Sequence, residues 1–277
     1  MFMRFTAPLM IATASISIAM PVMAQDNDTD VLFELLMLPE VLAIMREEGM
    51  SYGEGLAQDL FAGSSTAEWQ RKVEDIYNYD VMVAMVREDF ESALVDVDLT
   101  PMINFFGSDQ GQTIVGLEVS AREALLDDAV EEASKELAAT ALADENPRMS
   151  MVQDFVTINN LIETNVAGAL NSNLAFYSGL LDGDAFGGAV SEDQLLTDVW
   201  SQESEIRGST TEWIQSFLFM AYQPLEDTDL QAYIAFSETD AGADINRAMF
   251  VSFDRLFNGI SRSLGRAAAT EMTSQEL

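Results

Sequence analysis

The sequence predicts an all-α protein, a helical bundle built from two related helical-hairpin halves. Apolar residues recur three or four positions apart nearly everywhere, no run alternates strictly between apolar and polar residues, and helix-start patterns recur along the chain. We divide the chain into a signal segment over residues 1–24, a first helical half over 25–147 and a second over 148–277. The two halves are expected to form one compact unit.

The first half is expected to begin with a helix after Gln25, and Pro39 then opens a second segment. Proline suits the first turn of a helix, where no backbone N–H is needed. The apolar face of this segment is predicted to end at Gly49. A capping-box pattern at 65–68 then starts a long helix whose apolar side chains extend over 69–94.

Further helix-start signals complete the first half. Thr100-Pro101 opens a short helix, and a turn over 107–111 leads into a helix predicted from about Thr113 to Ala143. These segments are expected to pack as a helical hairpin.

Asn146-Pro147 is the clearest break in the chain, because proline disfavours helix in the residue before it. Beyond this break, capping-box patterns at 150–153 and 191–194 start further helices. A loop rich in glycine and acidic residues lies between them over 182–188.

The two halves also resemble each other. The pattern at 65–68 followed by Trp69 is answered by 209–212 followed by Trp213. At another fixed offset, Asp98, Leu99, Ile103, Phe105, Asp109 and Gly111 correspond to Asp229, Leu230, Ile234, Phe236, Asp240 and Gly242. One such hairpin cannot bury its apolar face alone, so two copies with their flanking helices are predicted to close around a shared core.

Two blocks carry a resemblance to a known family: MINFFGSDQGQ over 102–112 and YIAFSETDAG over 233–242. Both resemble the helical hairpin of the exported bacterial proteins of the domain of unknown function 2059 family, in which phenylalanine is followed by serine and then glycine. The resemblance implies a helical protein of the Gram-negative periplasm without an established activity. It supplies no catalytic residues.

Residues 1–24 have the plan of a cleavable signal peptide: Arg4, an apolar run over 9–20, and the small residue Ala24 before the expected cleavage site. A retained membrane anchor is the competing interpretation, but the apolar run is short for a bilayer span of ~20 residues. We therefore expect a soluble periplasmic protein with no integral membrane segment after signal removal.

The composition excludes several kinds of chemistry. The chain has no cysteine and no histidine, which excludes thiolate nucleophiles, disulfides, Ser-His triads and imidazole-bound metals. Its formal net charge of −34 opposes binding to nucleic acid. We expect no cofactor and no metal site, and the oligomeric state is left open.

Trp200, Glu203, Arg207 and Trp213 form the first candidate group for binding. Glu203 and Arg207 are four residues apart, in the order that favours pairing on a helix. The alternative is a purely local ion pair near Gly208. Gln202-Glu203-Ser204 also resembles the Glu-Ser pair of lytic transglycosylases, but the companion segment of that family is missing downstream.

Glu163 and Asn165 are the second candidates, on a helix crowded with asparagine. An amide-lined groove for a glycan or peptide is one interpretation, and a solvated polar stripe is the other. Asn165 is placed nearer the apolar side, where a buried amide needs partners.

The sequence thus favours a non-enzymatic binding or scaffolding protein that offers a groove between its halves to a protein, peptide or envelope component. The alternative is a carboxylate-dependent hydrolase or lyase acting on peptidoglycan, with Glu203 or Glu163 as the acid.

Overall fold

The computed structural model describes residues 22–61, 66–187 and 190–275, and the predicted signal segment falls largely outside them. The chain is all-α, as predicted, with no strand in these ranges. In chain order the helices are α1 (Val22–Leu35), α2 (Leu38–Leu60), α3 (Ala67–Ile76), α4 (Tyr79–Ala93), α5 (Thr100–Phe106), α6 (Asp109–Ala124), α7 (Asp128–Ala143), α8 (Pro147–Ile158), α9 (Leu161–Asp182), α10 (Glu192–Ser201), α11 (Glu203–Tyr222), α12 (Asp227–Ser237) and α13 (Asp240–Gln275).

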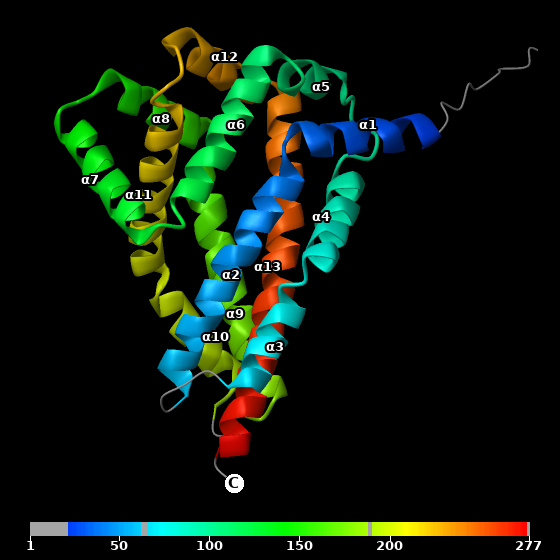
Figure 1. Ribbon diagram of the computed structural model, residues 1–277, viewed down its shortest axis with the longest axis vertical. Coiled ribbons are helices and arrows are strands. Elements are labelled where there is room, and N and C mark those ends of the chain that lie inside the picture. The colour runs from blue at the N-terminus through cyan, green and yellow to red at the C-terminus, as the bar shows by residue number, and fades with distance from the viewer. Residues whose placement is uncertain (1–21, 62–65, 188–189, 276–277) are drawn as a thin grey trace, which may run out of the picture.

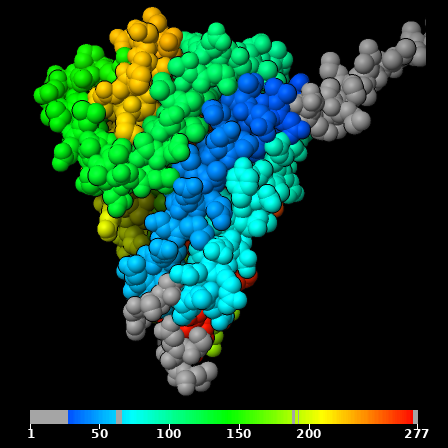
Figure 2. All heavy atoms as spheres, viewed as in Figure 1, coloured from blue at the N-terminus to red at the C-terminus, as the bar shows by residue number. Residues whose placement is uncertain are grey.

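The long helix α13 runs through most of the height of the molecule, with α9 packed along it and α4 packed against it as well (Figure 1). Helix α11 packs against α6, α7 and α9. The outline is a wedge (Figure 2), broad where α5, α8 and α12 lie and narrow toward α3, α10 and the end of α13.

Two large apolar clusters form the core. The first combines side chains of α1–α5 with those of α13, and the second combines side chains of α7 and α8 with those of α11 and α12. Helix α6 contributes to both clusters. Helix α13 therefore completes the core around the first five helices, so the two halves of the sequence interlock.

Helix α2 continues past Gly49, contrary to the prediction, and ends at Leu60. A Cβ on Gly49 would lie 2.1 Å from the ring of Tyr77, and one on Gly53 would lie 2.6 Å from Val73. These glycines let α3 approach α2 closely, and neither of them ends the helix.

Two of the long helices that the periodicity predicts are each divided. The first becomes α3 and α4, because the side chain of Asn78 accepts a hydrogen bond from the N–H of Val81 at 3.1 Å and caps α4. The second becomes α6 and α7, because the side chain of Asp127 accepts from the N–H of Ala129 at 2.9 Å. Both residue types favour a helix start, a signal that apolar spacing alone does not contain.

The predicted capping boxes have different outcomes. The box formed by Ser191 and Gln194 is confirmed at the start of α10. Helix α3 is capped by Thr66, whose side chain accepts from the N–H of Trp69 at 3.0 Å, while Ser65 lies outside the described residues.

The break in the middle of the chain is confirmed, since α7 ends at Ala143 and Asn146 caps α8, which begins at Pro147. The predicted helix start at Ser150 is wrong, because this residue already lies inside α8. The glycine-rich connector starts at Gly183, one residue later than predicted, because Asp182 is the last residue of α9, and its predicted end at 188 lies outside the described residues.

The turns α5–α6 and α12–α13 have the same local hydrogen bonds. The side chain of Ser108 accepts from the N–H of Gly111 at 3.0 Å, and that of Thr239 accepts from the N–H of Gly242 at 3.1 Å. Each hydroxyl also donates to a backbone carbonyl three residues earlier.

Both turns also require glycine for the same reason. A Cβ on Gly111 would lie 2.2 Å from the carbonyl oxygen of Phe105, and one on Gly242 would lie 2.3 Å from that of Phe236. The two phenylalanine rings stack on each other, with centroids 4.2 Å apart and planes 10° apart. The α5–α6 and α12–α13 hairpins therefore contact each other through equivalent phenylalanines.

Candidate functional site

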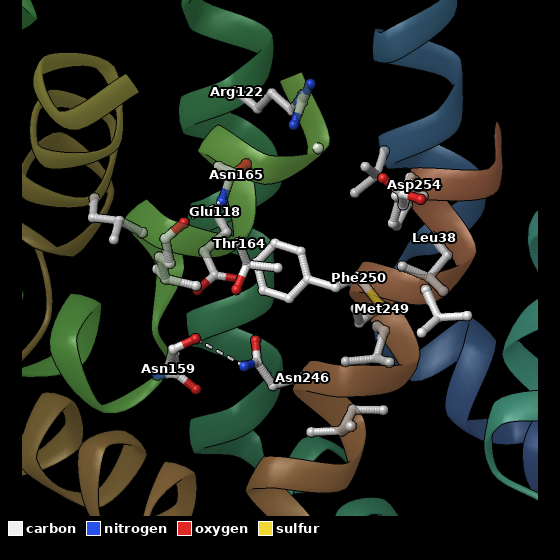
Figure 3. Close-up of a pocket in the computed structure, with 18 of the residues that line it drawn as sticks. Leu38, Glu118, Arg122, Asn159, Thr164, Asn165, Asn246, Met249, Phe250 and Asp254 are labelled. Atoms are coloured by element: carbon white, nitrogen blue, oxygen red, sulfur yellow. Dashed lines mark hydrogen bonds between the residues drawn. The ribbon is translucent and has the colours of Figure 1, made fainter. Parts of the chain in front are cut away.

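A cavity of about 930 Å³ lies between α2, α6, α9 and α13, where the two halves of the sequence meet (Figure 3). Most of the side chains that line it are apolar, and aromatic rings of Phe155, Phe217, Phe236 and Phe250 are among them. The volume falls within the range of ~300–1,000 Å³ that is typical of small-molecule sites.

Helices α6 and α13 line the cavity with corresponding positions. At the spacing that relates Asp109 to Asp240, the lining pairs are Val115 and Asn246, Glu118 and Met249, Val119 and Phe250, and Arg122 and Phe253. Where the first half supplies two charged side chains, the second supplies methionine and phenylalanine.

Helices α2 and α9, together with the residues just before them, also line the cavity with corresponding positions. Each begins after a residue in the left-handed region, Met37 with φ of 50° and Asn160 with φ of 52°. At the spacing between those two residues, the lining pairs are Leu36 and Asn159, Leu38 and Leu161, Val41 and Thr164, and Met45 and Gly168. Here the first half supplies apolar side chains, and the second half supplies most of the polar ones.

Glu118 faces the cavity from α6, and its carboxylate is bound by two tyrosines. The hydroxyl of Tyr222, at the end of α11, donates to Oε1 of Glu118 at 2.5 Å. The hydroxyl of Tyr233 on α12 also hydrogen-bonds this carboxylate. Among the described residues, Glu118 forms no ion pair with a lysine or an arginine.

Burial raises the pKa of Glu118 to about 7, and the hydrogen bonds from the two tyrosines oppose this rise without cancelling it. Burial also raises the pKa of Tyr222 and of Tyr233 well above the usual value, and the nearby carboxylate adds to the effect. The tyrosines therefore stay hydroxyl donors, while Glu118 changes between a neutral acid and a carboxylate close to neutral pH.

Amide groups form a second polar patch of the wall. The carbonyl oxygen of Asn159 accepts a hydrogen bond from Nδ2 of Asn246 at 2.9 Å (Figure 3). The side chain of Asn159 is buried and donates to the carbonyl oxygen of Phe155 at 3.0 Å. In Figure 3, Thr164 and Asn165 project from α9 near Glu118.

A second carboxylate, Asp254, lines the cavity from α13. Asn171 donates to one of its oxygens at 3.2 Å and Asn258 to the other at 2.9 Å. Asp254 is likewise without an ion pair to lysine or arginine in the part of the chain that the structure describes.

The two arginines that line the cavity are both neutralised. Arg122 donates to both carboxylate oxygens of Glu48 on α2, at 3.0 and 2.7 Å. Arg255 forms an ion pair with Asp89, a buried residue of α4. Neither arginine therefore offers a free positive charge to a bound molecule.

Three of the six residues predicted from the sequence come together outside this cavity. Arg207 pairs with Glu203 on its own helix at 2.7 Å, as expected, and also binds Glu163 of α9 through two nitrogens at 2.5 and 2.9 Å. The hydrogen bonds from Arg207 lower the pKa of Glu163. A general acid needs the opposite shift, so this geometry disfavours Glu163 as a proton donor.

The remaining three predicted residues are dispersed. Trp200 is 61% exposed on α10. Trp213 stacks on Phe217, one of the residues lining the cavity, at 5.2 Å between ring centroids. Asn165 lines the cavity but is exposed, contrary to the expectation of a buried amide, and its side chain donates to the carbonyl oxygen of Leu161 one turn earlier.

Sequence reasoning missed Glu118 and its two tyrosines. One signal was present: Gly111, Ile114, Val115 and Glu118 follow helical spacing, which places a carboxylate on the buried face of an amphipathic helix. The tyrosines follow Glu118 by about a hundred residues, and no local pattern connects them to it.

Within the described residues, no helix combines the length and apolar character that crossing a bilayer requires. Clusters of three or more carboxylates suited to a metal ion are also missing from this part of the chain. No family model, no curated protein and no solved structure matches the chain. The resemblance to the domain of unknown function 2059 family therefore stays a prediction.

Proposed function

We propose that the protein is an exported, periplasmic binding protein that holds a mainly apolar small molecule in the cavity between α2, α6, α9 and α13. The observation that carries this proposal is the cavity of about 930 Å³, with its mostly apolar and aromatic wall. Such a wall stabilises a ligand by removing apolar surface from water. Export rests on the signal-like pattern of residues 1–24.

Binding fits the site better than catalysis on peptidoglycan. The chain contains neither histidine nor cysteine, and the candidate acids Glu163 and Glu203 are both paired with Arg207. A glycan needs many polar partners along its length, whereas this cavity is lined mainly by hydrocarbon side chains. The hydrolase alternative predicts release of soluble fragments from purified sacculi, and Glu203→Gln would abolish that release.

We also infer that the two halves are copies of one ancestral unit. The support is the matching turns before α6 and α13, the stacking of Phe105 on Phe236, and the repeated lining positions. In this interpretation the cavity lies between the copies, and their divergence produced its polar features.

The proposal is tested with N-phenyl-1-naphthylamine, a neutral apolar dye whose fluorescence rises on leaving water. The unmodified protein is expected to bind one dye molecule saturably. A Cβ on Gly168 would meet only Oδ1 of Asp254, at 3.8 Å, so there is room for a larger side chain to grow from this lining position. Gly168→Phe is therefore expected to weaken dye binding at least tenfold.

The matched control is Gly208→Phe. Gly208 is an exposed glycine within α11, and a Cβ at this position would have no atom within 4 Å. This variant should bind the dye like the unmodified protein. Absence of saturable binding, or equal binding by both variants, would contradict the proposed function.

A further inference from the structure

We propose that the ligand of this cavity carries a protonated amine next to its apolar body, and that the carboxylate of Glu118 binds this amine. The inference rests on the proposed function, because it specifies the chemistry of the molecule that the cavity holds. It follows from the charges, the aromatic rings and the hydrogen bonds around Glu118.

Among the described residues that line the cavity, the carboxylates lack ion-pair partners and the arginines have them. Glu118 and Asp254 have no cationic partner among the described residues, whereas Arg122 and Arg255 are neutralised by Glu48 and by a buried aspartate. A carboxylate inside a largely apolar wall is costly unless a cation accompanies it. A ligand that brings its own positive charge removes this cost, and an anionic ligand increases it.

The rings around Glu118 favour the same class of ligand. Tyr233, which hydrogen-bonds Glu118, lies 4.7 Å from the ring of Phe155 between centroids and belongs to the aromatic group that includes Phe105 and Phe236. Ring faces attract ammonium groups through their negative electrostatic potential. Phe155, Tyr233 and Phe236 line the same cavity as Glu118, and a carboxylate among aromatic rings is a combination that suits an amine and offers little to a phosphate or a carboxylate.

Hydrogen-bond capacity is left at Glu118 for a ligand. A carboxylate has about four acceptor positions on its two oxygens, and the hydroxyls of Tyr222 and Tyr233 occupy two of them. The tyrosines orient the carboxylate, while an ammonium group entering from the cavity still finds a free lone pair. The overall charge of −34 also raises the local concentration of cations and lowers that of anions.

Binding of an amine to Glu118 is coupled to the release of a proton from its carboxyl group. Below neutral pH the carboxyl is mainly protonated, so an ammonium ligand displaces the proton to solvent and leaves an ammonium–carboxylate pair. The groups that face this site are Tyr222 from α11, Tyr233 from α12, Arg122 from α6, and Asp254 and Arg255 from α13. Helices α2 and α9 line the cavity without titratable side chains.

The test compares three probes with the same chain, namely decylamine, decanol and decanoate, by isothermal titration calorimetry at pH 6 and pH 8.5. Decylamine is expected to bind at least tenfold more tightly than decanol, and decanoate most weakly. Like a lysine side chain, the amine stays protonated at both pH values. Titrations in buffers of different ionisation enthalpy should show release of most of one proton at pH 6 and almost none at pH 8.5.

Glu118→Gln should remove the advantage of decylamine over decanol and the proton release, while decanol binds within about twofold of its original affinity. Retained decanol binding shows that this variant is folded. The control Glu123→Gln makes the same change at an exposed position of α6 outside the cavity and should keep the advantage.

The outcomes separate the two proposals. Equal affinity for decylamine and decanol in the unmodified protein would overturn the amine inference and leave apolar binding intact. Failure of all three probes to bind would contradict the proposed function itself. Loss of the advantage in Asp254→Asn, with Glu118→Gln unaffected, would overturn the assignment to Glu118.

Discussion

In the second half of the chain, α9 and α13 stay packed together over a long interface, whereas in the first half α2 meets α6 and the chain then turns away into α7 (Figure 1). Two glycines allow the long contact. A Cβ on Gly179 would lie 2.2 Å from the carbonyl oxygen of Arg262, and one on Gly265 would lie 2.1 Å from that of Phe176. The backbones of α9 and α13 therefore touch at this crossing.

The corresponding positions in the first half are Leu56 on α2 and Ser134 on α7. Their side chains would prevent the close backbone approach that the glycines permit. Asp127, together with Asp128 in the first turn, instead starts a new helix that packs against α11. We therefore attribute the different paths of the two segments to the size of the residues at this one crossing.

The largest expected effect on stability comes from adding a methyl group at this helix crossing. Gly265→Ala places a methyl group where a backbone oxygen already lies, so α9 and α13 must separate. We expect a loss of more than about 3 kcal/mol in the free energy of unfolding, at the upper end of overpacking effects. Urea denaturation followed by circular dichroism measures it.

The matched control for this variant is Gly116→Ala on α6, where no atom lies within 4 Å of the added Cβ. It should be neutral or stabilising by up to about 1 kcal/mol, because alanine is the better helix former. If both substitutions had similar effects, the close crossing would not explain why the two halves differ.

The next effect concerns Glu118, whose counterpart in the second half is the uncharged Met249. Burial raises the pKa of Glu118 to about 7 from an ordinary value of 4.5. The folded state therefore holds its proton more tightly than the unfolded state, so this group lowers stability as pH rises from about 4.5 to 7. Below that window the penalty is absent.

Glu118→Gln keeps an acceptor for the tyrosine hydroxyls and cannot ionise. Its stability relative to the unmodified protein should therefore increase between pH 4 and pH 8, by at most about 3 kcal/mol. Contact between the carboxyl group and water in the cavity makes this gain in stability smaller. Thermal melts across this range measure the change, and a pH-independent difference would contradict a raised pKa at this site.

Local signals predicted much of the fold. Helical spacing predicted the all-α class, and Asn146 with Pro147 marked the break between α7 and α8 correctly. The division of α6 from α7 depended on Asp127, whose capping role was hidden within a continuous apolar pattern. The run of helix past Gly49 depended on the ring of Tyr77, a contact between separate helices that spacing does not reveal.

The cavity was less accessible to sequence reasoning. Its charged and amide groups come from α6, α9 and α13 and from Asn159 at the end of α8, and the two tyrosines that bind Glu118 come from α11 and α12. The predicted cluster around Arg207 relied on spacing within one helix, which found its pair with Glu203. The same reasoning could not show that Glu163 would join them on the surface, away from the cavity.

The smallest effect tests whether the turns before α6 and α13 are equivalent in energy as well as in geometry. Ser108→Ala and Thr239→Ala each remove a side chain that accepts a hydrogen bond from a glycine N–H in the first turn of a helix. Loss of such a cap costs about 1 kcal/mol, so both variants should show nearly the same decrease in stability.

Ser120→Ala, at an exposed interior position of α6, provides the control and should not lower stability, because alanine has the higher helix propensity. A substantial loss in only one of the two cap variants would show that the turns share a shape without sharing its energetic basis. Equal losses would show that the two turns share one energetic basis, so that the differences between the halves lie in the residues that line the cavity and in the glycine crossing of α9 with α13.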